Sequence, residues 1–385
     1  MKIAIFSDCH CGFKFGEERG EDSFKSLEEA IELSRDADLI LLAGDVFDTR
    51  IPRLEIISRT AKILNKTKFY KSNAKLIYSD KQINHHILGT PIIAIHGTHE
   101  RRTKELINPI QMLEDTGQLI YLHNSTVIFD INGKKVAIHG MSGVPERYAK
   151  SVLMSWNPKP IENAINIFMF HQSIEPYIYS PLEPPTLKPE DLPDGFDLYV
   201  LGHLHWHDEK KLKNGILLLT GSTSITSLHK NEANQEKGIY FYNGKELEFK
   251  PLKYQRKIFF EEINLNKIEN IENEINRIIS KIPETAIKPI LSLFLYGKPK
   301  ASIDLNKIEK MLSKKAIVYI KKAEAKEENT FDIKLPLQKI SPEEQGIKIL
   351  KDILKEKNCD IKNIEDIFEL LVLDETEKVI NELLK

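Results

Sequence analysis

Cysteine is scarce in this chain, with three in 385 residues: Cys9, Cys11 and Cys359. An odd number without regular spacing excludes the disulfide framework that supports many small secreted domains. No run approaches the 18 apolar residues of a membrane-spanning helix, and the apolar segment at residues 2–6 is too short for a signal peptide. We therefore expect a soluble, intracellular protein with no membrane partner.

An excess of charge of one sign is also missing. The chain has 55 Lys and Arg against 57 Asp and Glu, a net charge of −2. This balance excludes a uniformly basic nucleic-acid coat and a highly acidic disordered chain, so any phosphate-binding surface has to be local. Glycine and proline, at 18 each, are too few for a collagen-like or low-complexity chain. With 41% hydrophobic residues, the sequence predicts a folded protein of two or three domains.

The first 250 residues repeat one pattern, in which a short apolar run ends in a polar cluster and a helix-like stretch often follows. The apolar runs cover residues 2–7, 39–43, 91–96, 136–138, 165–170 and 198–201. Residues 23–37 and 53–66 have the three- and four-residue apolar spacing of amphipathic helices. Residues 71–81 show neither signal and are predicted to form a surface loop. The alternation predicts an α/β fold with its chemistry at the carboxyl ends of strands.

The character of the sequence changes near residue 250. Residues 251–328 hold 16 Lys and Arg against 11 Asp and Glu and read as strand, helix, strand, helix, strand, which predicts a small basic α+β domain. Residues 329–385 have the opposite balance, 9 against 13. After an extended segment, they predict helices around residues 347–354, 364–371 and 379–384. A helical segment this short buries too little apolar surface to be stable alone. We therefore expect it to dock, either on its own chain or on a partner.

Five polar clusters follow the apolar runs in a fixed order. They are Asp8-Cys9-His10, Gly44-Asp45-Val46-Phe47-Asp48, Gly97-Thr98-His99-Glu100, His171-Gln172 and Gly202-His203-Leu204-His205. Carboxylate oxygen and imidazole nitrogen bind divalent transition metals, and this mixture suits Mn, Fe or Zn better than Ca. Residues two apart in an extended strand end point the same way, so Asp8 and His10 can hold one metal together. One such pair is an ordinary surface feature, whereas five in order indicate a metal site.

This order resembles the calcineurin-like metallophosphoesterase superfamily, whose signature reads D-x-H, G-D-x-x-D, G-N-H-[D/E], a lone His and G-H-x-H. The resemblance covers residues 1–250 and implies a four-layered αββα sandwich that holds two metals. By matching motif, Asp45 would bridge the metals, Asp8, His10 and His205 would complete one site, and His171 and His203 would hold the other. His99 would be the catalytic residue at the leaving group. Such an enzyme hydrolyses phosphodiesters by means of a metal-bridging hydroxide.

One position departs from the signature, because Thr98 stands where the family has a metal-binding Asn. A hydroxyl is a poorer neutral ligand than an amide oxygen. We therefore expect the second metal to bind weakly, to use water at that position, or to recruit Glu100. Asp48 stands where some members have His, and we expect it to orient a neighbouring ligand or Arg50.

Three other candidates are assigned no chemistry. Cys9 and Cys11 flank His10 but have no C-x-x-C partner, so we expect them to take no part in metal binding. His139 follows the apolar run at 136–138. It is expected to end a strand there, as a hydrogen-bonded histidine beside the sheet.

The three-part organisation and the sequence Gly-Asp-Val-Phe-Asp-Thr-Arg at 44–50 narrow the resemblance to double-strand-break repair nucleases of the SbcD and meiotic-recombination-eleven type. It implies a nuclease domain at 1–250, a DNA-contacting capping domain at 251–328, and a linker and helical segment at 329–385. It also implies a Mn-dependent 3'-5' exonuclease and single-strand endonuclease with two Mn²⁺ per chain, acting on double-stranded DNA ends and single-stranded DNA. The implied partner is an SMC-like coiled-coil ABC ATPase, bound through about 341–385. The implied state is a homodimer in a prokaryotic cytoplasm, on the nucleoid.

Arg101, Arg102 and Lys104 follow His99 closely, where they could meet a scissile phosphate or begin a solvated helix. Two other functions fit the same motifs. One is a metallophosphoesterase for nucleotides or phosphoproteins, because the motifs set the chemistry and not the leaving group. The other is a mainly structural subunit whose site is impaired by Thr98.

Overall fold

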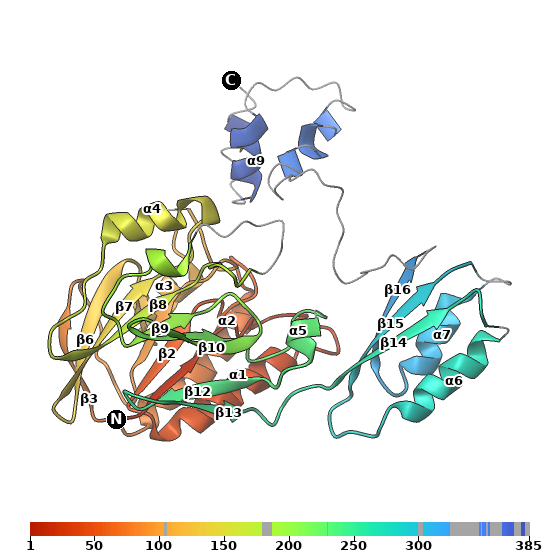
Figure 1. The fold of residues 1–385 in the computed structure, drawn as a ribbon, viewed down its shortest axis with the longest axis horizontal. Coiled ribbons are helices and arrows are strands. Elements are labelled where there is room, and N and C mark those ends of the chain that lie inside the picture. Colours follow the sequence, from red (N-terminus) through yellow and green to blue (C-terminus); the bar gives the residue numbers. More distant parts are fainter. Residues whose placement is uncertain are drawn as a thin grey trace.

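The computed structural model describes residues 1–103, 106–178, 187–228, 230–268, 270–298 and 303–323. In the tail it describes residues 346–347, 349–351, 353–354, 364–372 and 379–381. Figure 1 shows a larger body built from the first 250 residues and a smaller one that follows it. Within the described residues, no helix has the length and apolar character needed to cross a membrane.

Two sheets form the centre of the larger body. The first contains, in spatial order, β13 (Leu247–Pro251), β12 (Gly238–Tyr242), β1 (Ile3–Phe6), β2 (Leu39–Ala43), β4 (Ile92–Ile95) and β5 (Ile120–Tyr121). The second contains β10 (His207–Leu212), β11 (Gly215–Thr220), β9 (Leu198–Leu201), β8 (Ala164–Phe170), β7 (Lys134–Met141), β6 (Ser125–Ile131) and β3 (Ala74–Ser79). β1, β2 and β4 pair in parallel, as do β7, β8, β9 and β11. Within each parallel set, the carboxyl ends therefore lie along one edge.

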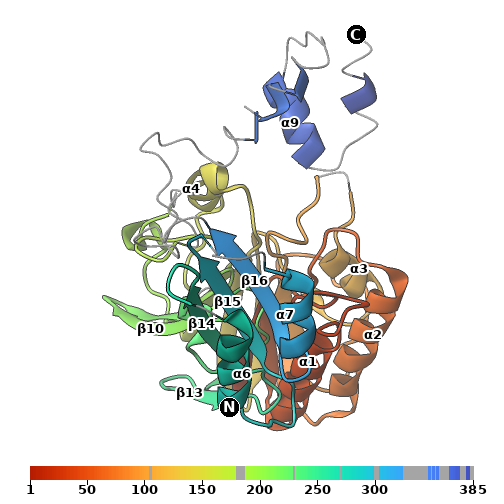
Figure 2. The same ribbon diagram turned by 90° about the vertical axis from the view of Figure 1, so that its right-hand side faces the viewer.

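Side-chain alternation along the strands explains the layers. Ile3 and Ile5 of β1 pack between the two sheets, whereas Ala4 and Phe6 pack under the helices on the outer face. That outer layer contains α1 (Asp22–Leu33), α2 (Leu54–Leu64) and α3 (Pro109–Asp115). On the other side, α4 (Glu146–Trp156) covers the second sheet through a core that includes Phe168. The predicted four-layered αββα sandwich is confirmed (Figures 1 and 2).

The smaller body is a three-stranded parallel sheet in the order β14, β15, β16, with two crossover helices on one face. Its elements are β14 (Ile258–Asn264), α6 (Ile271–Lys281), β15 (Ile290–Tyr296), α7 (Leu305–Leu312) and β16 (Ile317–Ala323). Residues 252–257 connect it to β13. In the tail, α9 covers Ile364–Val372.

Short elements complete the described chain. They are the 3₁₀ helices η1 (Ser34–Asp36), η2 (Asn65–Phe69) and η3 (Pro189–Asp191), and the one-turn helix α5 (Lys230–Ala233).

Two local expectations were wrong. Residues 71–81 are not simply a loop, because they contain β3, which forms an edge of the second sheet by antiparallel pairing with β6. His139 does not end a strand, because β7 continues to Met141. His139 is nevertheless buried and hydrogen-bonded as expected, with Nδ1 3.0 Å from Thr126 Oγ1.

Candidate metal centre

The five polar clusters of the sequence meet where the two sheets present their carboxyl ends. Asp8 and Asp45 lie two residues beyond β1 and β2, and His99 lies in the loop after β4. His171 directly follows β8, and His203 lies two residues beyond β9. The fold thus brings together residues that are almost 200 positions apart in the sequence.

The backbone is unusual at four of these positions. The φ angle is positive at all four: 50° at Asp8, 46° at His10, 48° at Asp45 and 85° at His203. This left-handed region is costly for residues with a side chain and occurs often at functional sites. At these positions the backbone turns away from the strand direction, and the side chains that follow converge on the candidate metal centre.

Glycine is required where two of these loops approach another ligand. A Cβ atom on Gly97 would lie 2.2 Å from Asp45 Oδ1, and one on Gly202 would lie 2.6 Å from His171 Nδ1. Neither position has room for a side chain. The glycines of the third and fifth clusters therefore allow the close packing of the centre.

Asp8, His10 and His205 form the first candidate metal group, with one ligand atom of each within 4.8 Å of the others. His10 Nε2 lies 3.1 Å from His205 Nε2, and Asp8 Oδ1 lies 3.9 Å and 3.8 Å from these two nitrogens. All three residues are buried. Two imidazoles and a carboxylate that converge in this way suit a divalent transition metal.

Asp8, Asp45 and His171 form a second group within the same distance limit. His171 Nδ1 donates to the carbonyl of Ala43 at 2.8 Å, so its Nε2 is the ring atom that faces Asp45 Oδ2, 3.2 Å away. Against the effect of burial, the Asp45 carboxylate raises the pKa of His171 to about 10. His171 holds the pKa of Asp45 well below its usual range, although burial opposes this.

The surroundings of His171 test whether these residues fit a metal. Its Nε2 is fully buried and makes no hydrogen bond of acceptable geometry, although it lies close to the Asp45 carboxylate. A divalent cation bound by both Nε2 and the Asp45 carboxylate would satisfy the two groups. The residues therefore fit a divalent metal, as the chemistry of the donor set also indicates.

His203 lies beside the second group. Its ring centre is 5.3 Å from that of His171, and its backbone N–H donates to Asp8 Oδ2 at 3.0 Å. Burial, and then the nearby His171, lower the pKa of His203 to about 3, so the ring is neutral as a metal ligand must be. Asp8 belongs to both groups in this arrangement, so the bridging role of Asp45 stays a prediction.

His99 and Asp48 form the rim of the centre. His99 is 46% exposed, and its Nδ1 donates to the backbone carbonyl of Asp48 at 2.8 Å. The Asp48 carboxylate lies 3.2 Å from His10 Nδ1, and therefore orients that ligand as expected. With His10, these two residues make a third group of possible metal ligands.

Glu100 is buried between the loops that carry Asp45 and His99. Its Oε1 accepts from Phe47 N at 2.7 Å and its Oε2 from Gly97 N at 3.0 Å. Burial and the charge of Asp45 raise the pKa of Glu100 to about 8. Because both oxygens accept from backbone N–H groups, Glu100 supports the loops. Its recruitment by a metal, one of the three alternatives for the second site, stays a prediction. Thr98 is exposed and lines the pocket beside His99.

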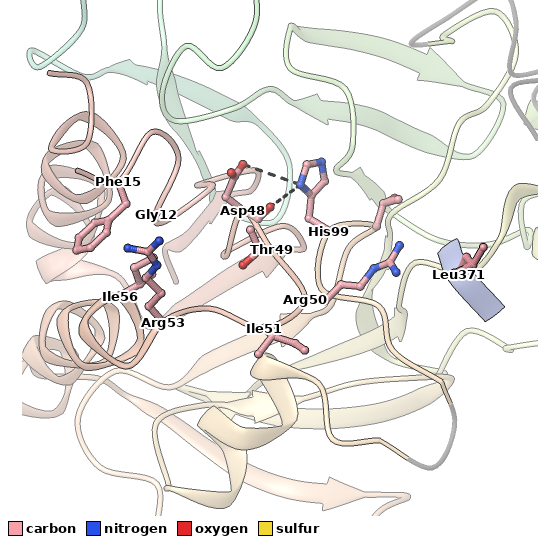
Figure 3. A pocket seen from close by; sticks show the side chains of 11 residues that line it. Gly12, Phe15, Asp48, Thr49, Arg50, Ile51, Arg53, Ile56, His99 and Leu371 are labelled. Carbon is pink, nitrogen blue, oxygen red and sulfur yellow. Dashed lines mark hydrogen bonds and ion pairs between the residues drawn. The ribbon is translucent and has the colours of Figure 1, made fainter. Parts of the chain in front are cut away.

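A pocket of about 780 Å³ opens beside the metal centre (Figure 3). His99, Asp48, Arg50 and Arg53 are among the residues that line it, together with Leu371 of α9. No role in substrate binding was predicted for Arg50 or Arg53 from the sequence. The sequence signal that could have indicated such a role is their position shortly after the second polar cluster.

Arg101 and Arg102 line a different pocket, of about 520 Å³, together with Lys81 and Glu114. Arg102 Nη1 donates to the carbonyl of Ile107 at 3.4 Å. Lys104 lies outside the described residues. A contact of these three residues with a scissile phosphate stays a prediction.

Cys9 and Cys11 are buried, and burial raises the pKa of both thiols, that of Cys11 to about 12. Thiols that remain protonated are poor metal ligands. That the two thiols take no part in metal binding stays a prediction.

A family model described as calcineurin-like phosphoesterase matches residues 1–207. The chain belongs to the calcineurin-like phosphoesterase family. Together with the two ligand groups, this membership identifies a metal-dependent phosphoesterase domain. The matched residues include all five polar clusters.

Curated relatives share a more specific name. "DNA double-strand break repair protein Mre11" of Methanopyrus kandleri is 30% identical over 225 residues, which cover 53% of this chain and 44% of that protein. "Double-strand break repair protein MRE11" of Mus musculus is 24% identical, covering 72% and 44% of the two chains. A third relative, from Methanocaldococcus jannaschii, is also named "DNA double-strand break repair protein Mre11". It is 25% identical over 339 residues, which cover 83% of this chain and 82% of that protein. The alignments with the first two span less than half of those relatives' length.

Proposed function

We propose that this chain is a Mn²⁺-dependent DNA nuclease and the nuclease subunit of a double-strand-break repair complex. The observation that carries the proposal is the pair of metal groups that share Asp8, next to a pocket lined by His99, Arg50 and Arg53. Guanidinium groups bind phosphate oxygens strongly, so the two arginines can position a DNA backbone across the centre. The names of the curated relatives support DNA as the substrate.

In this proposal the chain holds two Mn²⁺ ions. Asp8, His10 and His205 would hold one ion, His171 and His203 would hold the other, and Asp45 would be a ligand of both. When bound, the ions supply positive charge to the phosphodiester and lower the pKa of water. His99 is oriented by its hydrogen bond to the Asp48 carbonyl, and its other ring nitrogen, Nε2, would give a hydrogen bond or a proton to the leaving alkoxide.

The direct test is Mn²⁺-dependent degradation of end-labelled duplex and single-stranded DNA by the purified chain, which also reports the proposed 3'-5' polarity. His205→Ala removes a ligand and should abolish cleavage. His99→Ala should reduce the rate by roughly 10²- to 10⁴-fold with unchanged Mn²⁺ affinity, because His99 acts on the leaving group. His86→Ala, at an exposed position away from the centre, is the matched control.

The same assay separates the alternatives. Faster hydrolysis of nucleotides or phosphopeptides than of DNA would favour a phosphoesterase with another substrate. Binding of the ATPase partner without hydrolysis of any substrate, even with ATP present, would favour a structural subunit with a site impaired by Thr98.

We further propose that residues 341–385 bind an SMC-like coiled-coil ABC ATPase, that the chain forms a homodimer, and that it acts in a prokaryotic cytoplasm on nucleoid DNA. The basic segment at 251–328 would serve as the DNA-contacting cap beside the nuclease domain at 1–250. Most of 329–385 lies outside the described residues, but α9 carries the exposed Leu371. Deletion of 341–385 should abolish co-purification with the ATPase and leave Mn²⁺-dependent cleavage intact. Undiminished partner binding by the shortened chain would contradict this assignment.

A further inference from the structure

A buried ion pair lies at the Nδ1 edge of His205 and has no part in the chemistry proposed above. Glu232 is 1% exposed and Lys237 is 3% exposed, and Lys237 Nζ lies 3.3 Å from Glu232 Oε1. Moving two charges out of water costs several kcal/mol for each ion, and apolar replacements of such pairs are often as stable. Stability alone therefore does not explain why these two charges are buried here.

Lys237 fixes the backbone of the metal ligand. Its Nζ donates to the carbonyl oxygen of His205 at 2.8 Å and to Ser222 Oγ at 2.8 Å. With the ion pair to Glu232, these contacts occupy the three donors of the ammonium group. The last polar cluster is thereby tied to the loop that follows β11.

Glu232 fixes the loop that holds the ring of the same ligand. Its carboxylate accepts from Thr226 N at 2.8 Å and from the hydroxyl of Ser227 at 2.6 Å. Thr226 Oγ1 lies 2.7 Å from His205 Nδ1, and Glu232 Oε2 lies 3.4 Å from the same nitrogen. The Nδ1 edge of His205 therefore faces a hydroxyl and a carboxylate. The carboxylate can only accept, so it favours a hydrogen on that nitrogen.

We infer that Glu232, Lys237 and Thr226 are the positioning residues of His205, and that they set its metal affinity. A hydrogen on Nδ1 leaves the lone pair on Nε2, the atom that faces Asp8 and His10 in the first metal group. A carboxylate beside Nδ1–H also makes Nε2 a stronger electron donor to a metal. The inference rests on the proposed metal-dependent function, since it concerns how tightly that centre holds its ion.

The test is calorimetric titration of the full chain with Mn²⁺, comparing the wild type with Glu232→Gln. Glutamine keeps the shape of the side chain and removes its charge. We expect Mn²⁺ to bind the first site about 10- to 100-fold more weakly, the usual effect of losing a carboxylate that supports a histidine ligand. Glu236→Gln, an exposed change four residues away, should leave the affinity unchanged. The electron paramagnetic resonance spectrum of bound Mn²⁺ should change with Glu232→Gln and not with the control.

Circular dichroism and thermal unfolding without metal show whether the variant is folded. If Glu232→Gln unfolds because Lys237 is left without its counter-ion, Glu232→Gln/Lys237→Met removes both charges and must still lose Mn²⁺ affinity. If the wild type cleaves DNA and the folded Glu232→Gln variant has the Mn²⁺ affinity and the spectrum of the wild type, this inference is wrong and the proposed function stands. A wild-type chain that binds no Mn²⁺ overturns the proposed function and this inference together.

Discussion

Three candidate histidine ligands, on three different loops, are held in the same way by the protein. His10, His171 and His205 each direct Nδ1 to a protein oxygen: Asp48 Oδ1 at 3.2 Å, the Ala43 carbonyl at 2.8 Å and Thr226 Oγ1 at 2.7 Å. In each case Nε2 is left to face the centre. Ligands that are already oriented lose little conformational entropy when a metal binds.

Thr98 differs from these oriented side chains. It lies on the His99 loop, is exposed, and stands where the family signature has an amide ligand. Thr98→Asn should strengthen binding of the second Mn²⁺ by about tenfold and lower the Mn²⁺ concentration needed for cleavage, because an amide oxygen is a better ligand than a hydroxyl. Titration of wild type and variant with Mn²⁺ measures this. Thr98→Ser is the control, and an Asn variant that binds no better than Ser would show that the position is not used for metal binding.

The sequence could predict which ligands converge but not which arginines face them. Asp8, Asp45 and His171 follow apolar strands, and the parallel order of those strands brings their ends together. The directions of Arg50 and Arg101 depend on loops whose course is set by tertiary packing. For the same reason Thr226 and Glu232 could not be recognised, since no motif marks a residue that contacts a ligand only in the folded chain.

At the scale of elements, most of the apolar runs form strands as predicted, whereas β3 was missed and β7 was given the wrong end. β1, β2 and β9 are continuous apolar runs, because helices or the other sheet cover both faces. β3 is an edge strand with exposed residues at Lys75, Ile77 and Tyr78, so its pattern is interrupted. β7 was predicted too short, because a buried histidine resembles a strand end in the sequence.

That histidine makes the second sheet sensitive to acid. Burial lowers the pKa of His139 to about 4, from an ordinary value of 6.5. Below pH 6.5 the unfolded chain takes up a proton that the folded chain excludes, so the free energy of unfolding should fall as the pH drops from about 6.5 to about 4. The contribution of His139 is at most about 3 kcal/mol.

Urea denaturation at several pH values measures this effect. Because His96 is also buried, with its pKa lowered to about 3, wild type has to be compared with a variant. His139→Gln should have a smaller loss of stability between pH 6.5 and 4 than wild type. Identical pH dependence of the two proteins would show that His139 is not responsible.

At the scale of the whole molecule, Asp22 at the start of α1 connects the two bodies. It is 5% exposed, and its carboxylate accepts from Arg256 Nε at 2.7 Å and from Arg19 Nε at 3.4 Å. Arg19 Nη1 also lies 3.3 Å from the hydroxyl of Tyr319 in β16. One buried carboxylate therefore pairs with two arginines at the junction of the sandwich with the small domain.

Asp22→Ala should lower the free energy of unfolding by about 3–5 kcal/mol, because it leaves buried positive charge without its partner. It should also speed proteolysis in the connection at residues 252–257. The adjacent Glu21→Ala is the control, since the Glu21 side chain is 53% exposed in its pair with Arg59 and such pairs contribute at most about 1 kcal/mol. Equal urea midpoints for the two variants would contradict the connecting role of Asp22.

The order of strands in the first sheet has a consequence for synthesis of the protein. β1 lies between β2 and β12, and Lys237, which supports His205, immediately precedes β12. At 5–20 residues per second, a ribosome needs roughly 11–46 s to pass from Asp8 to Lys237. Asp8 and His10 are therefore made well before the last residues that surround the same centre. A nascent chain on its messenger RNA would carry no assembled phosphodiesterase until Lys237 and β12 have been made.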